Sequence, residues 1–397
     1  MRYFNNTEIA FAAQSDQSLR SARLLFRWIG DPILTKVGTA LLNGALRLHL
    51  PVARVIEKTA FKHFVAGGDL ADALHVVRKL ARYNIRSIMD YAVEGKSDES
   101  DFERTFQATL SVIDFASTHR EIPFVVFKPS GFGRLALYQK MSAGGIMSTA
   151  ESEEWKRVVA RFDRVCRKAR ENDLTAMVDA EESWVQKAVD DLVFEMMKKY
   201  NRHYCAVCNT LQMYRKDRLA YLKARCEIAE KADFFIGYKV VRGAYMEKET
   251  ARAAALGYEN PIHLSKGATD RDYDAAVDFI LDHLDRISLF AGTHNEKSCY
   301  LLKQNMKARG IAKDHQKIWF GQLYGMGDHI SFELAHAGYN VAKYLPYGPL
   351  RDVMPYLIRR ARENTSVKGQ ASREVSLIQS ELKRRKSIRD NSHVPGN

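Results

Sequence analysis

The spacing of hydrophobic residues along the chain changes near residue 85. Before that point, three segments carry apolar residues three and four positions apart, as amphipathic helices do: residues 18–28, 35–50 and 70–83. After it, eight short runs rich in β-branched and aromatic residues recur, most of them separated by longer segments with helical spacing. The chain is therefore predicted to begin with helices and to continue as alternating strands and helices.

The eight apolar runs are predicted to be strands buried on both faces, because continuous hydrophobic runs are typical of parallel sheets covered by helices. They are residues 87–93, 123–127, 175–178, 204–211, 234–241, 287–291, 318–323 and 339–345. The helical segments between them include residues 154–172, 181–200, 217–231, 270–284, 296–309 and 328–337. This pattern favours an α/β fold, a (β/α)8 TIM barrel preceded by an N-terminal helical segment; an open doubly wound sheet is the alternative.

The chain has 397 residues, enough for one barrel-sized core. We divide it into an N-terminal helical segment at residues 1–84, a barrel at 85–367, and a basic C-terminal helix and tail at 368–397. The net charge of +13 suits an anionic cofactor, an anionic membrane surface or nucleic acid, but no nucleic-acid-binding motif is recognisable. Part of this surplus lies in Lys383-Arg-Arg-Lys386, which we interpret as a solvated helix face.

Five cysteines in a chain of this size predict no disulfide framework and favour a reducing compartment. Cys205-Ala-Val-Cys208 lies in a predicted strand, where residues three positions apart point to opposite faces. We therefore expect neither a redox role for this pair nor a metal site. The N-terminus lacks an apolar leader and no run of eighteen apolar residues exists, so we expect no secretory signal, no typical transit peptide and no membrane-spanning helix.

Polar or reactive residues follow nearly every predicted strand. In chain order they are Asp90 and Glu94, Lys128, Asp179, Gln212, the segment Arg242-Gly-Ala-Tyr245, the segment Thr293-His-Asn295, the segment Leu323-Tyr-Gly-Met326, and Tyr344. A barrel of this class gathers its chemistry at the carboxyl ends of its strands. The sequence therefore predicts a functional pocket at the barrel mouth.

Two adjacent arginines, Arg359 and Arg360, lie on the helix predicted after the eighth strand. Paired guanidinium groups bind carboxylates or phosphates through planar forks of donors, although such a pair is also common on a solvated helix face. The position beside the barrel mouth favours the pocket. A helix that starts near Arg351 or Asp352 places Pro355 in its first turns, where proline is tolerated.

The predicted pocket combines several cations with few acids. Its cations are Lys128, Lys239, Arg242, Arg359 and Arg360. This balance suits an anionic substrate together with an anionic cofactor, and Gly243 allows the backbone to approach a phosphate closely. Asp179 either orients the cations or acts as a base, and a weak one because the cations lower its pKa. His294 is either a satisfied core histidine or a functional group.

One motif favours a different fold. Gly131-Phe-Gly-Arg-Leu-Ala136 follows a predicted strand and begins like a Gly-rich dinucleotide fingerprint. However, it follows the second strand and does not lead into a clean strand that ends in an acid. We therefore do not interpret it as a nicotinamide dinucleotide site.

Four motifs together resemble proline dehydrogenase. They are Asp179-Ala-Glu-Glu182, Val241-Arg-Gly-Ala-Tyr245, Gly292-Thr-His-Asn295 and the segment 344–364 with its Arg-Arg helix, in the order expected for that family. The resemblance covers roughly residues 85–367 and extends more weakly into the N-terminal helices. Asp90-Tyr-Ala-Val-Glu-Gly95 is more similar to the mitochondrial and related bacterial branch than to the long bifunctional bacterial enzymes.

The resemblance implies a distorted (β/α)8 barrel that binds FAD non-covalently. It implies oxidation of L-proline to Δ1-pyrroline-5-carboxylate, with hydride transfer from proline C5 to flavin N5 and electron transfer to a membrane quinone. A separate pyrroline-5-carboxylate dehydrogenase would act downstream. The implied location is the bacterial cytoplasm at the inner face of the membrane, or the matrix side of a mitochondrial membrane in a eukaryote.

The resemblance also assigns roles to individual residues. The catalytic set is Asp179, Lys239, Arg359 and Arg360. The substrate-binding set is Lys128, Tyr245, Leu323, Tyr344, Tyr356, Arg359 and Arg360. The FAD-binding set is Ala180, Gln212, Lys239, Val241, Arg242, Gly243, Ala244, Thr293, His294, Asn295 and Glu363. Lys239 stands where the family often has arginine, and Arg242 where it often has lysine.

Two further expectations follow from the resemblance. Glu94 would pair with Arg359 as a gate when substrate is absent. Tyr344 predicts a preference for proline, because hydroxyproline-oxidising relatives carry a small residue at this position.

Two other functions remain open: a barrel enzyme acting on another phosphorylated or carboxylated substrate, and a non-catalytic basic module on a membrane or nucleic acid. Any membrane contact is expected to be peripheral, through the C-terminal or the N-terminal helices.

Overall fold

Eight parallel strands close into a barrel in the computed structural model, which describes residues 3–31, 57–91, 98–366 and 370–392. The strands are β1 (Ile85–Tyr91), β2 (Phe124–Phe127), β3 (Thr175–Val178), β4 (Val207–Gln212), β5 (Ile236–Val241), β6 (Ile287–Gly292), β7 (Ile318–Leu323) and β8 (Val341–Tyr347). They follow one another in chain order, and β1 pairs with β8 from Ile85↔Val341 to Tyr91↔Tyr347. This pairing confirms the predicted barrel and excludes the open sheet.

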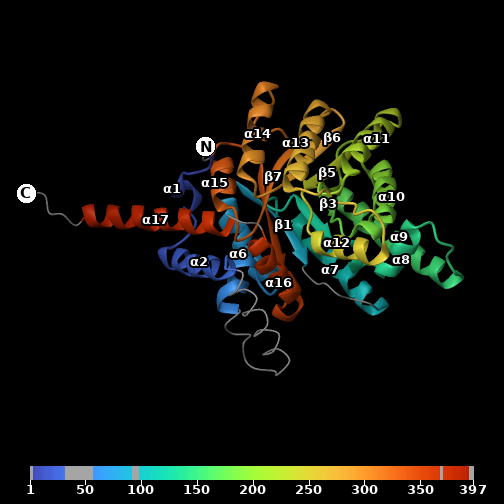
Figure 1. Ribbon diagram of the computed structural model, residues 1–397, viewed down its shortest axis with the longest axis horizontal. Coiled ribbons are helices and arrows are strands. Elements are labelled where there is room, and N and C mark those ends of the chain that lie inside the picture. Colours follow the sequence, from blue (N-terminus) through green and yellow to red (C-terminus); the bar gives the residue numbers. More distant parts are fainter. Residues whose placement is uncertain (1–2, 32–56, 92–97, 367–369, 393–397) are drawn as a thin grey trace, which may run out of the picture.

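Helices surround the barrel (Figure 1). In the barrel they are α7 (Glu99–Ser117), α8 (Leu135–Ser142), α9 (Thr149–Glu171), α10 (Ser183–Tyr200), α11 (Arg218–Lys231), α12 (Met246–Leu256), α13 (Lys266–Asp282), α14 (Glu296–Ala308), α15 (Asp328–His336) and α16 (Leu350–Ser366), with the single 3₁₀ turn η2 (Pro129–Gly131). The apolar side chains between strands and helices form the main core. A smaller apolar cluster that includes Ile88, Phe124, Met177 and Phe290 fills the inside of the barrel, so the barrel is not an open pore.

Outside the barrel, the N-terminal part contains α1 (Thr7–Ala10), α2 (Asp16–Ile29), the π-helical turn η1 (Glu57–Phe61), α5 (Lys62–Phe64) and α6 (Leu70–Ala81). The C-terminal helix α17 (Gln370–Ser392) lies beside α2 (Figure 1). The helices expected at residues 18–28 and 70–83 are confirmed, and the one expected at 35–50 lies outside the described residues. None of the described helices is long and apolar enough to cross a membrane. The three-part division of the chain stays a prediction.

The fourth strand begins three residues later than predicted. The side chain of Asn201 accepts a hydrogen bond from the Val207 N–H at 2.8 Å and donates one to the Val207 carbonyl at 2.9 Å, so the chain turns before β4. Cys205 therefore lies outside the strand, and its thiol lies beside that of Cys208, both against Gly237. The expectation that these cysteines point to opposite faces was wrong; both are free thiols.

The helix that carries the two arginines rests on a second apolar cluster, separate from the main core. This cluster contains Leu19 and Phe26 of α2, Val353 and Leu357 of α16, and Ile378 of α17. α16 begins at Leu350, one residue before the expected start, so Pro355 lies in its second turn. Segments from the two ends of the chain thus hold α16 in place.

The basic run near the C-terminus is only partly solvated. Lys383 and Lys386 are exposed, as expected. Arg385 instead pairs with Asp16 of α2 at 3.0 Å and donates hydrogen bonds to the carbonyls of Phe11 and Gln14. Arg384 lies 3.3 Å from Glu8 of α1, so half of the run joins α17 to the N-terminal helices. An arginine fork can reach carboxylate and carbonyl oxygens together.

We predict that Phe26→Ala weakens the support of α16. Phe26 is buried and packs edge-on against His63 and Phe64, with ring centroids 5.2 and 6.1 Å away. Removing a buried phenyl ring typically costs about 3–5 kcal/mol of unfolding free energy. Leu24→Ala is the control, because Leu24 is 54% exposed on the same helix and its loss should cost less than about 0.5 kcal/mol. Urea unfolding of both variants checks this, and equal effects would contradict it.

Candidate active site

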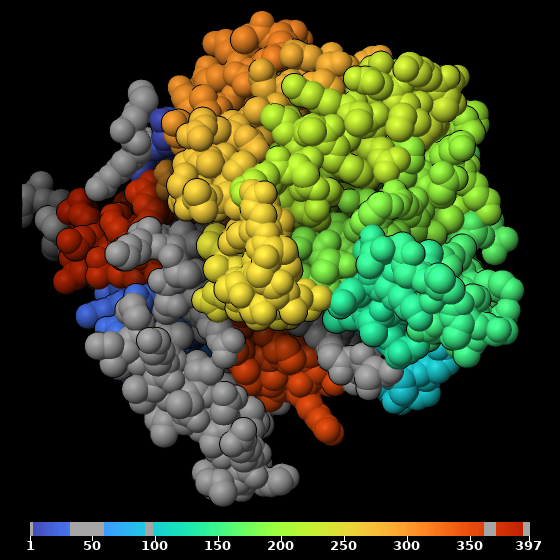
Figure 2. Space-filling model, turned by 45° about the vertical axis from the view of Figure 1, so that its right-hand side comes forward, coloured from blue at the N-terminus to red at the C-terminus, as the bar shows by residue number. Residues whose placement is uncertain are grey.

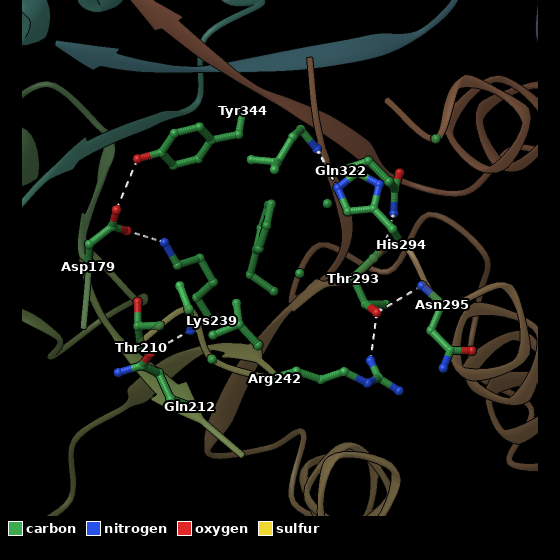
Figure 3. Close-up of a pocket in the computed structure, with 18 of the residues that line it drawn as sticks. Asp179, Thr210, Gln212, Lys239, Arg242, Thr293, His294, Asn295, Gln322 and Tyr344 are labelled. Carbon is green, nitrogen blue, oxygen red and sulfur yellow. Dashed lines mark hydrogen bonds and ion pairs between the residues drawn. The ribbon is translucent and has the colours of Figure 1, made fainter. Parts of the chain in front are cut away.

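A cavity of about 670 Å³ lies at the carboxyl ends of the strands (Figure 3). On the outer surface, α12 (yellow) lies between α13 (gold) and α16 (orange-red) on one face of the molecule (Figure 2). Residues that line the cavity come from most of the strand ends, from α16 and α17, and from Tyr3 near the N-terminus. Among the described residues, the lining includes eight lysines and arginines but three acidic residues. The cavity therefore favours anionic ligands.

Nearly all predicted site residues meet in this cavity. Those that line it are Lys128, Asp179, Ala180, Gln212, Lys239, Val241, Arg242, Gly243, Ala244, Tyr245, Thr293, His294, Asn295, Leu323, Tyr344, Tyr356, Arg359 and Arg360. Glu94, which was predicted to act as a gate, lies outside the described residues. Glu363 belongs to α16, but its side chain is also outside the described part of the structure.

An ionic cluster lies at the centre of the cavity wall. Asp179, directly after β3, forms an ion pair with Lys239 of β5 and accepts a hydrogen bond from the Tyr344 hydroxyl of β8 at 2.9 Å (Figure 3). Lys128, directly after β2, lies 3.3 Å from the same carboxylate and 3.4 Å from Asp90 of β1. The Lys239 ammonium also lies 5.5 Å from the centre of the Tyr344 ring. One carboxylate thus joins residues from three other parts of the barrel.

The protonation state of this cluster follows from its charges. Burial alone would raise the pKa of Asp179, but the adjacent Lys239 and Lys128 outweigh burial and hold that pKa well below its usual range. Burial and the negative charges of Asp179 and Asp90 raise the pKa of Tyr344. Asp179 therefore remains an anion and Tyr344 a neutral donor at neutral pH. This geometry favours the orienting role for Asp179, because so acidic a carboxyl group is a poor base.

The side chain of Arg242 is held by hydrogen bonds to other side chains around the barrel mouth. Its guanidinium donates hydrogen bonds to Asp270, Thr293 and Ser298 over distances of 2.7–2.9 Å and lies 4.3 Å from the centre of the Tyr273 ring. These contacts hold the β5 and β6 ends together. Arg242 therefore supports the cavity wall, and the backbone that follows it is left to line the cavity.

Backbone after β5 adopts a conformation that only glycine tolerates well. Gly243 has φ of +126°, and a Cβ at this position would collide with the ring of Tyr214. Gln212 accepts a hydrogen bond from the Ala244 N–H at 3.2 Å and donates one to the Glu181 carbonyl at 2.7 Å. The loop is thereby fixed with its main chain against the cavity.

His294 is neutral and keeps one ring nitrogen for another partner. Burial and the cations Lys343 and Arg360 lower its pKa to about 3. Nε2 accepts a hydrogen bond from the Leu323 N–H at 3.3 Å, so the proton must lie on Nδ1. Among the described residues this buried Nδ1 has no hydrogen-bond partner. Within the described residues, only one of the two ring nitrogens of His294 is therefore satisfied.

The two arginines are not on a solvated face. Arg360 is 8% exposed, its guanidinium lies 5.2 Å from the centre of the Tyr356 ring, and both arginines line the cavity.

Thr293 accepts a hydrogen bond from the Asn295 N–H at 3.0 Å, while the Asn295 side chain caps the N-terminus of α14. Asn295 thus combines a place in the wall with a structural task.

Sequence reasoning missed several residues around the cavity. Lys343 of β8 is fully buried, pairs with Asp328 at 2.7 Å and donates to the carbonyls of Leu323 and Met326, which holds the loop after β7. A lysine within an apolar strand was a signal that could have revealed it. Arg373 of α17 also lines the cavity and pairs with Glu296 at 2.7 Å. No local pattern could have indicated that long-range contact.

Glu181 is a further residue whose task the sequence did not indicate. Its carboxylate accepts hydrogen bonds from the N–H and the hydroxyl of Ser130, at 2.8 and 2.6 Å. Ser130 lies two residues after Lys128, so this contact ties the loop after β2 to the loop after β3. Glu181 therefore helps to set the distance between Lys128 and Asp179.

Comparison with known proteins gives consistent matches. The proline dehydrogenase family model matches residues 73–373. A relative from Pectobacterium carotovorum, the carbapenem antibiotics biosynthesis protein CarD, is 40% identical over 81% of this chain and 83% of its own length. The human mitochondrial proline dehydrogenase 1 is 39% identical over 62% of this chain and 42% of its own length. A hydroxyproline dehydrogenase from Xenopus laevis is 31% identical over 94% of this chain and 88% of its own length.

Solved structures support the fold. The crystal structure of proline utilization A from Bdellovibrio bacteriovorus, inactivated by N-propargylglycine, superposes with a TM-score of 0.70 at 19% identity. The match covers 91% of this chain but only 38% of that longer chain. At this level of identity the likeness establishes a shared barrel architecture.

We predict that Glu181 makes the stability of the protein depend on pH. Burial raises its pKa from 4.5 to about 7, despite the opposing hydrogen bonds from Ser130. Because the folded protein holds this proton more tightly than the unfolded chain, the stabilisation is complete below pH 4.5 and is lost as the pH rises through about 7. Glu181→Gln should abolish this slope, which amounts to about 3 kcal/mol.

The measurement is urea unfolding at a series of pH values across that window. Wild-type protein should lose stability relative to Glu181→Gln as the pH rises. Glu171→Gln is the control, because Glu171 is exposed at the end of α9 and its replacement should leave the wild-type slope unchanged. Parallel curves for wild type and Glu181→Gln would show that the buried glutamate does not titrate in this range.

Proposed function

Because the chain belongs to the proline dehydrogenase family, we propose that it oxidises L-proline to Δ1-pyrroline-5-carboxylate, the first step of proline catabolism. The observation that carries the proposal is the placement of Arg359 and Arg360 in the wall of the cavity that also contains the Asp179 ionic cluster. Paired guanidinium groups at the edge of a cationic cavity suit a small carboxylate substrate.

We propose that the cofactor is non-covalently bound FAD, since proline dehydrogenases in general are flavoenzymes. The described residues fit such a group in two respects. His294 has a buried donor nitrogen without a partner among them. Gly243 brings its main chain to the cavity wall, where a side chain would collide with Tyr214. When bound, the flavin supplies the acceptor for the hydride that leaves proline C5.

Most of the proposed cofactor-binding residues lie at the carboxyl ends of β3 to β6 or in the loops that come directly after these strands. They are Ala180, Gln212, Lys239, Val241, Arg242, Gly243, Ala244, Thr293, His294 and Asn295, together with Glu363 of α16. Neutral His294 would donate a hydrogen bond from Nδ1 to an acceptor atom of the cofactor. Lys239 would place a positive charge beside the cofactor, which suits an electron-rich group.

The proposed substrate site lies between the arginines and the ionic cluster. Arg359 and Arg360, with Lys128, hold the carboxylate of proline, and this fixes the position of the ring. Tyr245, Leu323, Tyr344 and Tyr356 form the walls around the ring. Asp179 remains ionised and keeps Lys239 and the Tyr344 hydroxyl in place. The excess of cations in the cavity disfavours a further positive charge, so the proline amine loses its proton to solvent before it reacts.

Electrons are proposed to pass to a membrane quinone, and a separate pyrroline-5-carboxylate dehydrogenase is proposed to use the product. This acceptor is consistent with a place at the inner face of a bacterial membrane, reached through peripheral contacts. The exposed Lys383 and Lys386 of α17 support such a contact with anionic lipid. The gathering of lysines and arginines around a cavity argues against a purely non-catalytic basic module.

We predict that Arg360→Met lowers kcat/KM for L-proline by roughly 10²–10³-fold, because removing one partner of a buried charge pair costs about 3–4 kcal/mol. A dye-coupled assay with L-proline measures the rate, and flavin absorbance of the purified protein separates loss of substrate binding from loss of cofactor. Arg351→Met is the matched control, since Arg351 is exposed on the same helix. An unchanged KM in Arg360→Met would argue against the carboxylate clamp.

We predict that Tyr344 selects proline over 4-hydroxyproline. Its ring lies in the cavity wall and its hydroxyl is held 2.9 Å from Asp179, so little space is left beside it. Tyr344→Ser should raise the ratio of kcat/KM for 4-hydroxyproline to that for proline by roughly tenfold or more, the lower range of what steric discrimination of one small group contributes. Tyr344→Phe keeps the ring and should keep the preference. Equal efficiency of the wild-type enzyme on both substrates would refute this assignment.

A further inference from the structure

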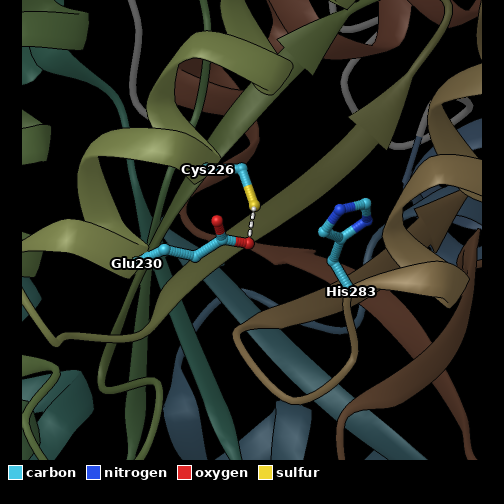
Figure 4. Close-up of side chains that lie close together, drawn as sticks. All are labelled: Cys226, Glu230 and His283. Carbon is cyan, nitrogen blue, oxygen red and sulfur yellow. Dashed lines mark hydrogen bonds between the residues drawn. The ribbon is translucent and has the colours of Figure 1, made fainter.

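Three side chains of the types that bind metal ions meet on the outer wall of the barrel, away from the cavity. Cys226 and Glu230 lie four residues apart on α11 and so share one helix face, and His283 follows directly after α13 (Figure 4). One ligand atom from each lies within 4.8 Å of the other two. A small hollow of about 180 Å³ adjoins them, lined by these three residues and by Lys223, Glu227 and Phe279.

The ring of His283 is held in one tautomer and one orientation. Its Nδ1 lies 2.8 Å from the carbonyl oxygen of Phe279, and its ring stacks on the Phe279 ring with centroids 4.1 Å apart. Nδ1 must therefore carry the proton and donate it to the carbonyl, which leaves the lone pair on Nε2. Metal-binding histidines almost always have such a second hydrogen bond, because it fixes the tautomer and the ring orientation.

The other two ligands already have a suitable separation. Cys226 Sγ lies 3.3 Å from Glu230 Oε1. Ligand atoms around a tetrahedral zinc ion lie about 3.5 Å apart, as follows from metal–ligand distances of about 2.0–2.3 Å. Because all three ligand atoms lie within 4.8 Å of one another, the His283 nitrogen needs to approach by at most roughly 1 Å to reach that spacing. Glu230 is exposed, so its side chain is able to adjust as the ion enters.

The charges of the hollow suit a divalent cation. Glu227 and Glu230 carry two negative charges and Lys223 carries one positive charge. When the ion binds, the Cys226 thiol releases its proton to solvent. The resulting thiolate brings the net charge of the side chains around the hollow to about −2, before the charge of the ion is counted. A combination of sulfur, imidazole nitrogen and carboxylate oxygen suits zinc, whereas Mg²⁺ and Ca²⁺ prefer oxygen alone.

We propose that Cys226, Glu230 and His283 bind one divalent zinc-type ion, with water completing a tetrahedral shell. The ion would join the end of α11 to the end of α13, next to the amino-terminal ends of β5 and β6. Residues at that end of a barrel contribute to stability rather than to chemistry, so the site is structural. Its existence does not depend on the proposed activity.

The test uses the metal-stripped full chain titrated with Co²⁺ and Zn²⁺. Wild-type protein should bind one Co²⁺ with a thiolate-to-cobalt charge-transfer band in the near ultraviolet, and Zn²⁺ should displace it. Cys226→Ser should abolish the band. His283→Gln, at a half-buried position, should weaken Zn²⁺ binding in calorimetry by at least roughly 10–100-fold, the loss that even an outer-shell partner causes.

Two control variants make the result specific. Glu227→Gln alters the same hollow without removing a ligand, and Cys205→Ser removes the most exposed of the other thiols. Both should keep the band, and Zn²⁺ should raise the unfolding temperature of both as much as that of wild type, but that of His283→Gln less at the same Zn²⁺ concentration. Absence of the band in wild type, or its persistence in Cys226→Ser, would overturn the proposal. Proline oxidation should be unchanged in Cys226→Ser, which separates this result from the fate of the proposed function.

Discussion

One carboxylate at the barrel mouth, largely shielded from water, links the ends of β2, β3, β5 and β8. Asp179 contacts Lys239, Lys128 and Tyr344, and the last of these lies 165 residues further along the chain. A charge removed from water is stable only when neighbouring groups neutralise it and satisfy its hydrogen bonds. Any shift in strand register would leave one of these charges without its partner. Barrel closure and the ionic cluster therefore specify one another.

Support for the cavity comes from both ends of the chain. α16 packs through Val353 and Leu357 into an apolar cluster built with α2 and α17, not into the main core of the barrel. Arg373 of α17 reaches Glu296 at the cavity wall and also the carbonyl of Phe4. The position of the two arginines thus depends on segments that lie outside the eight strand–helix units. The terminal helices therefore help to position side chains that line the cavity.

The two ends of the barrel differ in what their polar residues do. At the carboxyl ends, lysines and arginines exceed acids, and the excess is available to an anionic ligand. Near the amino ends of β5 and β6, Cys226, Glu230 and His283 converge on a hollow with the opposite charge balance. In both places, helices and strands far apart in the chain bring a few donor atoms to one point. The sign of the local charge decides which ion or molecule is attracted.

The sequence by itself determined the element order, the barrel and most of the lining of the cavity. Continuous apolar runs such as residues 175–178 and 318–323 became strands at the predicted positions, because burial on both faces leaves little freedom in such runs. Polar residues after those strands had to meet, since parallel strands present their carboxyl ends at one edge. Motif resemblance then supplied roles that periodicity does not contain.

Only the tertiary structure decided the contacts between distant segments. It placed Cys205 beside Cys208, because the Asn201 side chain forms hydrogen bonds with the N–H and the carbonyl of Val207, and the chain turns before β4. Secondary-structure propensities do not predict such a side-chain contact. It turned the Arg242 side chain toward Asp270, buried Lys343, and brought His283 to Cys226. Each depends on which side chain a neighbouring element presents at a given point. A linear pattern fixes the face on which a residue lies, but the partner across that face is set by packing in three dimensions.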